Sequence, residues 1–172
     1  MRAMGPGSVS SLLKTALDVV YVVLWGLIGA CVLIAVGSLF FPGLVEGRVR
    51  VEGTSLPPGA VAALALFGFS LYLGGILLIV GRLRRVFATL SAGDPFHPEN
   101  VRRLRIIGLI LAALAGVDTL VRIVGPWFLP AAEGAQQRFP DLIAWFSVLV
   151  VFVLAEVFRE GARLRREAEL TI

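Results

Sequence analysis

The chain is poor in the residues that usually bind metals or form disulfides. Its 172 residues contain one cysteine, one histidine and two methionines. The single cysteine, Cys31, excludes an intrachain disulfide, and the lone His97 excludes the paired Cys/His spacing of a zinc site. Met1 and Met4 lie at the N-terminus and His97 lies outside the apolar stretches, so no span carries a His or Met that could be an axial haem ligand. We therefore expect neither a metal nor a cofactor.

The sequence also lacks the short motifs of common catalytic sites. It contains no His-Glu-x-x-His motif, no Gly-x-Ser-x-Gly turn and no phosphate-binding loop. We therefore expect a protein that is not an enzyme. The formal charge of +4 would suit nucleic acid only on an ordered basic domain. No segment outside the apolar stretches is long enough for one, so we expect no direct nucleic-acid binding.

Charged residues are scarce, at 16% of the chain, whereas 58% of the residues are hydrophobic. Soluble domains are usually only about 45–50% apolar. Four stretches are nearly free of charge, at about 16–41, 58–80, 104–127 and 140–158. Each is long enough to cross the roughly 30 Å hydrocarbon core of a bilayer. We predict an all-α polytopic membrane protein, with residues 1–172 forming one membrane domain of four transmembrane helices in an antiparallel bundle.

Lysine and arginine gather on one side of the predicted spans. They lie before the first span, in the loop 81–103 and in the tail 159–172, whereas the other side has only Arg48, Arg50 and Arg138. Because basic loops stay inside, the loop, the tail and both termini are expected in the cytoplasm. Arg163 and Glu167 stand four residues apart, which favours a helix. The last helix should therefore extend past the membrane into the cytoplasm.

Two charged residues interrupt the third span. Asp118 and Arg122 are four residues apart and share one helix face. A charge at this depth costs about 2.5–3.5 kcal/mol on insertion scales, and pairing offsets part of that cost. The pair is either a structural ion pair that holds the helices together or part of an ion, proton or ligand path.

A second set of charges should lie at the inner membrane surface. Glu156 near the end of the fourth span and Asp18 near the start of the first are at similar depth. Arg105 and Arg159 are expected at the same membrane surface, where they could pair with these carboxylates. We expect a cluster of these four residues, which is either a structural latch or a ligand or lipid site.

Two further features concern helix packing. His97 precedes Pro98, so it should cap a helix whose first residue is that proline. Gly108, Ala112 and Gly116 form a stripe of small residues on the third span. Such stripes let helices approach closely. The stripe serves either packing within the chain or contact with a second copy in a homo-oligomer.

Two segments carry motifs that are similar to those of a known family. The first is Gly-Asp-Pro-Phe-His-Pro-Glu-Asn at 93–100, followed by Leu-Arg-Ile-Ile-Gly at 104–108. The second is Leu-Ala-Glu-Val-Phe-Arg-Glu-Gly at 154–161, followed by Glu-Leu-Thr-Ile at 169–172. Together they resemble the domain of unknown function 2975 family of bacterial four-helix membrane proteins, although His97 stands where Thr or Ser is expected. The matching positions are Gly93, Pro95, Phe96, Glu99, Asn100, Leu104, Arg105, Gly108, Glu156, Gly161, Leu170 and Thr171.

The resemblance implies four spans in a bacterial inner (cytoplasmic) membrane, with the motifs on the cytoplasmic side, and it implies no activity. Some members of the family are encoded beside small helix-turn-helix regulators, which implies a regulatory role by analogy. We therefore expect a protein of the lipid bilayer that binds a cytoplasmic regulator through the loop 81–103 and the tail 159–172. The alternative is a small transporter or channel subunit that uses Asp118 and Arg122.

Overall fold

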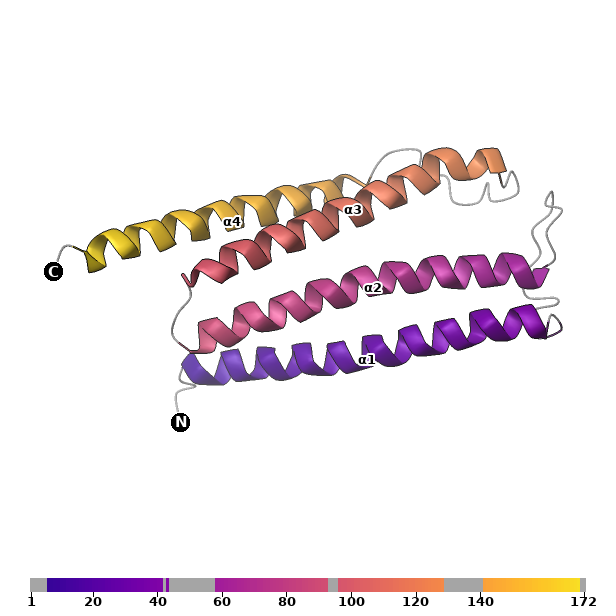
Figure 1. Cartoon of the computed structure of the whole chain (residues 1–172), viewed down its shortest axis with the longest axis horizontal. Coiled ribbons are helices and arrows are strands. Elements are labelled where there is room, and N and C mark those ends of the chain that lie inside the picture. Colours follow the sequence, from indigo (N-terminus) through magenta and orange to yellow (C-terminus); the bar gives the residue numbers. More distant parts are fainter. Residues whose placement is uncertain (1–5, 42, 44–57, 93–95, 129–140, 171–172) are drawn as a thin grey trace.

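The computed structural model describes residues 6–41, 43, 58–92, 96–128 and 141–170. The regular structure in these ranges is helical, with no strand (Figure 1). The helices are α1 (Pro6–Phe40), α2 (Pro58–Ser91), α3 (Pro98–Phe128) and α4 (Leu142–Glu169). Each contains an apolar segment of 27 to 33 residues, long enough to cross a membrane. The prediction of an all-α, four-span, multi-pass membrane protein is confirmed.

The helices begin and end where the local sequence favours it. Asp141 caps α4, because its Oδ1 accepts hydrogen bonds from the amides of Ile143, at 3.0 Å, and Ala144, at 3.4 Å. α2 and α4 continue about three turns beyond the predicted spans. These extensions are rich in Arg, Leu, Ala and Glu, which are good helix formers in water. The predicted extension of the last helix beyond its span is confirmed.

The four helices form two antiparallel hairpins. α1 packs along α2, α3 packs along α4, and the hairpins meet only through α2 and α3. The predicted bundle is therefore an open row of helices rather than a closed four-helix core. Both termini lie at the same end (Figure 1), which we call the basic end. It comprises the start of α1, the α2–α3 turn and the C-terminal part of α4.

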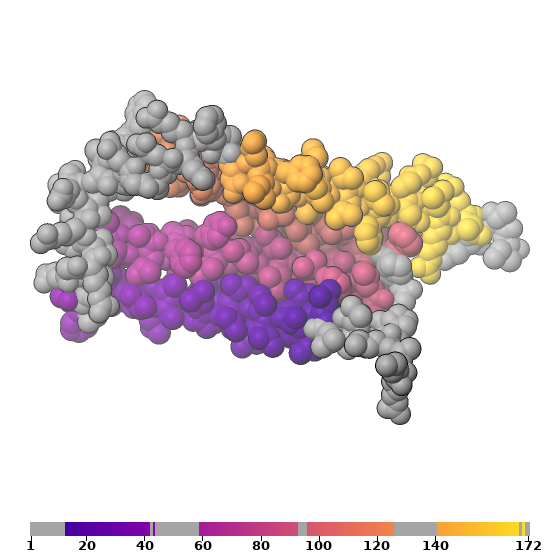
Figure 2. All heavy atoms as spheres, turned by 180° about the vertical axis from the view of Figure 1, so that it is seen from behind, coloured from indigo at the N-terminus to yellow at the C-terminus, as the bar shows by residue number. Residues whose placement is uncertain are grey.

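The hairpins are close at the basic end and separate toward the other end. Near the middle, a Cβ on Gly75 of α2 would lie only 2.8 Å from Leu114 Cδ2 of α3. Beyond this point α2 and α3 diverge, and Figure 2 shows an open space above α2 there. The contact between the two hairpins is therefore confined to the half of the molecule toward the basic end.

Two small apolar clusters form the core. The first joins α1 to α2 and includes Cys31, which is 7% exposed and so acts as a small core residue. The second joins α3 to α4 through Leu104, Ile107 and Ala155, and Ile79 of α2 packs against it. Most other large apolar side chains of the four helices face outward. This is the pattern expected where lipid, rather than protein, covers the surface.

Candidate functional site at the basic end

The start of α3 is fixed by the residue before it. His97 Nδ1 accepts a hydrogen bond from the amide of Glu99 at 3.3 Å, and the His97 carbonyl accepts one from Asn100 at 2.8 Å. Pro98 is the first helical residue, a position where its missing N–H has no consequence. The prediction that His97 caps this helix is confirmed. An imidazole nitrogen here does what a Thr or Ser hydroxyl does at other caps.

Asn100 lies at the centre of a polar network between α2 and α3. Its side chain is fully buried and hydrogen-bonds to the Thr89 hydroxyl of α2, at 2.7 Å from Nδ2. Arg103 donates to Asn100 Oδ1 and to the Arg85 carbonyl of α2, both at 3.1 Å, and also pairs with Glu99. Buried polar groups need such partners, so this network specifies how the two helices meet.

Phe96 connects the α2–α3 turn to α4. Its ring lies 5.9 Å from the Phe158 ring, and it covers Gly161 so closely that any Cβ there would overlap it. Residue 161 is therefore a glycine because the Phe96 ring leaves no room for a side chain, and not because the backbone needs an unusual conformation there. About two turns farther from the basic end, a Cβ on Gly108 of α3 would meet Phe152 of α4 at 3.1 Å. Residues from the two family-like segments thus touch each other across the α3–α4 hairpin.

We call the group formed by Phe96, Asn100, Thr89, Arg103, Phe158 and Gly161 the clasp. It holds the ends of α2, α3 and α4 together. The motif positions Leu104 and Gly108 lie buried just inside it, and Leu170 lies 86% exposed beyond it. Gly93, Pro95 and Thr171 lie outside the described residues.

The four residues expected to form one charge cluster lie in two places. Glu156 pairs with Arg159 of the same helix and lies 3.9 Å from Arg105 of α3. Asp18 is apart from them, because α1 contacts α2 and neither α3 nor α4. These three side chains of α3 and α4 are about half exposed. Exposed ion pairs contribute little to stability.

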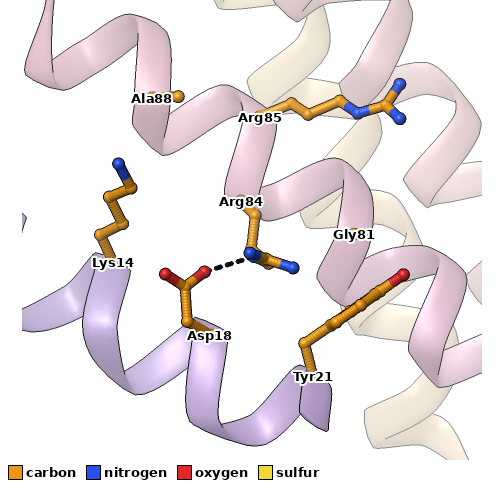
Figure 3. A pocket seen from close by; sticks show the side chains of 7 residues that line it. All are labelled: Lys14, Asp18, Tyr21, Gly81, Arg84, Arg85 and Ala88. Atoms are coloured by element: carbon orange, nitrogen blue, oxygen red, sulfur yellow. Dashed lines mark ion pairs between the residues drawn. The ribbon is translucent and has the colours of Figure 1, made fainter. Parts of the chain in front are cut away.

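Asp18 instead belongs to a site between α1 and α2 (Figure 3). Its Oδ1 lies 2.5 Å from Arg84 Nε, and the Arg84 guanidinium lies over the Tyr21 ring at 4.6 Å from the ring centre. Arg84 and Tyr21 were not among the residues singled out from the sequence. The pairing of Asp18 with Arg84 could have been predicted from the α1–α2 hairpin, because the two residues lie at similar distances along the chain from the connection between these helices.

Asp118 and Arg122 pair on the half of α3 that lies away from the basic end. Asp118 Oδ2 accepts a hydrogen bond from Arg122 Nε at 2.7 Å, and their side chains are 43% and 37% exposed. Asp118 is one turn beyond Leu114, the residue that meets α2, so it lies where the hairpins begin to separate. Asp141, at the start of α4, is within electrostatic range of Arg122.

The described residues offer no metal centre. Within them, no three His, Cys, Asp or Glu side chains lie close enough together to hold an ion. The stripe of small residues is partly occupied inside the chain, since Gly108 packs on Phe152, whereas nothing lies within 4 Å of a Cβ built on Gly116.

Comparison with known proteins identifies a family and no individual relative. No curated protein matches the chain, and neither does any solved structure. One family matches over residues 59–172, about two thirds of the chain, and its description is "Protein of unknown function (DUF2975)". The match includes α2, α3, α4 and the whole clasp but leaves out α1. The chain belongs to this family.

Proposed function

We propose that the chain is a non-enzymatic protein of a bacterial cytoplasmic membrane whose basic end faces the cytoplasm and binds a regulator protein there. The orientation is supported by the arginines, which gather at the ends of α2 and α4 and at the start of α3. The positive-inside rule places such segments in the cytoplasm. The family resemblance favours a small helix-turn-helix protein as the class of regulator.

The observation that carries the proposal is the shape of α4. Its last turns project beyond the ends of the other three helices (Figures 1 and 2). The clasp anchors this helix at Phe158 and Gly161, immediately before the projecting part. The projection is therefore presented in a fixed direction relative to the α2–α3 turn.

The projecting segment has the chemistry of a docking surface. Leu164 and Leu170 are 55% and 86% exposed although they lie beyond the membrane span predicted from the sequence. Arg163 is held between Glu160, at 2.8 Å, and Glu167, at 3.3 Å, which keeps the helix regular. Exposed apolar groups within a charged rim are typical of protein interfaces. A partner with a matching apolar patch and acidic groups would fit it.

The test is cross-linking of the tagged full-length protein in its native membrane, with identification of the cross-linked cytoplasmic protein. Leu164→Asp should abolish cross-linking to one specific regulator and change transcription of that regulator's targets. The control is Leu13→Asp, which alters an exposed leucine of α1 at the same end, outside the projecting segment and before the first predicted span. If both variants behave like the unmodified protein, the proposal is wrong.

A second candidate function is solute or proton transport, and one observation favours it. Asp118 and Arg122 are incompletely covered and lie where α2 and α3 separate. Charges within a membrane commonly mark ion or proton paths. Asp118→Asn should then abolish flux in proteoliposomes without lowering stability, whereas Asp141→Asn should leave flux intact. If Asp118→Asn lowers only stability, the pair is structural.

A further inference from the structure

A cavity of about 330 Å³ opens between α1 and α2 at the basic end. α1 contributes Lys14, Asp18 and Tyr21 to its wall, and α2 contributes the rest (Figure 3). The complete lining is Lys14, Asp18, Tyr21, Gly81, Arg84, Arg85 and Ala88. Lys14 and Arg84 face one carboxylate, Asp18, so the wall has an excess of positive charge. The cavity is therefore suited to an anion.

The positions of the charges show where an anion would lie. Arg84 is held in place by Asp18 and by the Tyr21 ring, which leaves guanidinium N–H groups other than Nε available. Lys14 rises from α1 beside Asp18 and makes no ion pair with any residue that the structure describes (Figure 3). Arg85 points away from Lys14, toward the far side of α2. An anion between Lys14 and Arg84 would meet one ammonium and one fixed guanidinium.

The cavity lies at the level where lipid headgroups are found. The first span predicted from the sequence begins at about residue 16, so Lys14 lies just before it and Asp18 lies near its start. Seven and fourteen residues after Asp18, on the same face of α1, Trp25 and Val32 are 56% and 37% exposed. An anion here could be joined to an acyl chain lying on that face. Basic pockets between membrane helices on the cytoplasmic side are known to hold anionic headgroups.

We propose that this cavity binds the phosphate of an anionic phospholipid headgroup, with Lys14 and Arg84 as the contacting cations. Asp18 positions Arg84 and does not touch the phosphate. The acyl chains lie along the face of α1 that carries Trp25 and Val32. The inference does not depend on the regulator of the proposed function. The cavity joins residues of α1, which lies outside the matched family region, to residues of α2, which lies within it.

Lys14 provides a direct probe because it is the only lysine in the chain. The full-length protein is placed in nanodiscs of phosphatidylcholine, with or without a third of phosphatidylglycerol, and treated with an amine-acetylating reagent. Mass spectrometry then gives the acetylation rate of Lys14 relative to the α-amino group. Phosphatidylglycerol should slow acetylation about fivefold, the effect of one basic residue at an anionic surface.

Two variants separate the site from general surface charge. Arg84→Gln should remove the protection of Lys14, whereas Arg102→Gln, which removes an exposed arginine of the same end outside the cavity, should keep it. Lys14→Gln leaves the packing between α1 and α2 intact because Lys14 is exposed. Native mass spectrometry should show that this variant retains about fivefold less phosphatidylglycerol.

Three outcomes would overturn the proposal. The first is equal acetylation of Lys14 with and without phosphatidylglycerol. The second is equal protection in Arg84→Gln and Arg102→Gln, which would show a general surface effect. The third is protection of Lys14 in pure phosphatidylcholine by soluble glycerol phosphate at millimolar concentration, which would assign the cavity to a free phosphate compound.

Discussion

At the scale of single residues, Gly161 and Phe96 form the tightest contact between the α2–α3 turn and α4. The hydrogen of the glycine leaves room for the Phe96 ring, which also packs on Phe158. Any larger residue at 161 must push the ring outward. Since interiors are close-packed, even one methyl group is felt there.

Gly161→Ala is expected to destabilise the protein by about 1–3 kcal/mol, the usual effect of overpacking. Unfolding in mixed micelles of increasing denaturing detergent measures the change. In a Phe96→Ala background the same substitution should have little effect, because the overlapping ring is gone. Gly116→Ala is the matched control, since nothing lies within 4 Å of its Cβ position. Equal effects of Gly161→Ala in both backgrounds would contradict this contact.

Asn100 gives a second prediction at this scale, based on its complete burial. Asn100→Ala removes the side-chain partner of Thr89 and one of the acceptors of Arg103. Leaving buried polar groups without partners costs about 1–3 kcal/mol. The same micelle assay should show that loss, whereas Ser91→Ala, which alters an exposed hydroxyl on the same part of α2, should change stability little. A neutral Asn100→Ala would mean that this network does not hold α2 and α3 together.

At the scale of elements, Gly75 of α2 and Leu114 of α3 mark where the two hairpins cross. Gly75→Leu should force the helices apart and destabilise the protein by about 1–3 kcal/mol. Adding Leu114→Ala should recover part of the loss, because it makes room for the new side chain. Gly68→Leu is the control, since Gly68 of α2 has open space at its Cβ position. If the two leucine variants are equally stable, the hairpins do not meet at Gly75.

The helices themselves could be predicted from the sequence because apolar length decides a membrane span. The cap at His97 could also be predicted, because a proline in the following position restricts the backbone to a helix start. The extension of α4 beyond its span could be predicted from the spacing of Arg163 and Glu167, whereas the extension of α2 contains no acidic residue to form such a pair. A hydropathy pattern ends at the first arginine, whereas the helix continues in water for as long as its residues favour helix formation.

The partners of charged residues were harder to predict than the helices. Asp118 and Arg122 are four residues apart on one helix, so their pairing could be predicted from the spacing alone. Asp18 was expected beside Glu156 because the two share a depth, but depth does not say which helices are neighbours. In the open row of helices α1 contacts only α2, so Asp18 pairs with Arg84 of α2 instead. The contact between Phe96 and Gly161 likewise depends on the packing of α3 against α4.

At the scale of the whole molecule, two hairpins are joined at one end and open at the other. The basic end contains the clasp, the cavity between α1 and α2 and the projecting part of α4. The opposite half contains the pair of Asp118 and Arg122 where the hairpins separate. Contacts of the basic end with a regulator or with an anionic lipid require that this end face the cytoplasm.

The orientation of the basic end is therefore the claim on which the rest depends. It can be measured with two reporters fused after Ile172 in a bacterial host: a fluorescent protein that matures only in the cytoplasm, and an alkaline phosphatase active only outside it. We predict a fluorescent fusion and an inactive phosphatase, with the reverse pattern when each reporter replaces the chain beyond Gly43, between α1 and α2. An active phosphatase after Ile172 would contradict the account.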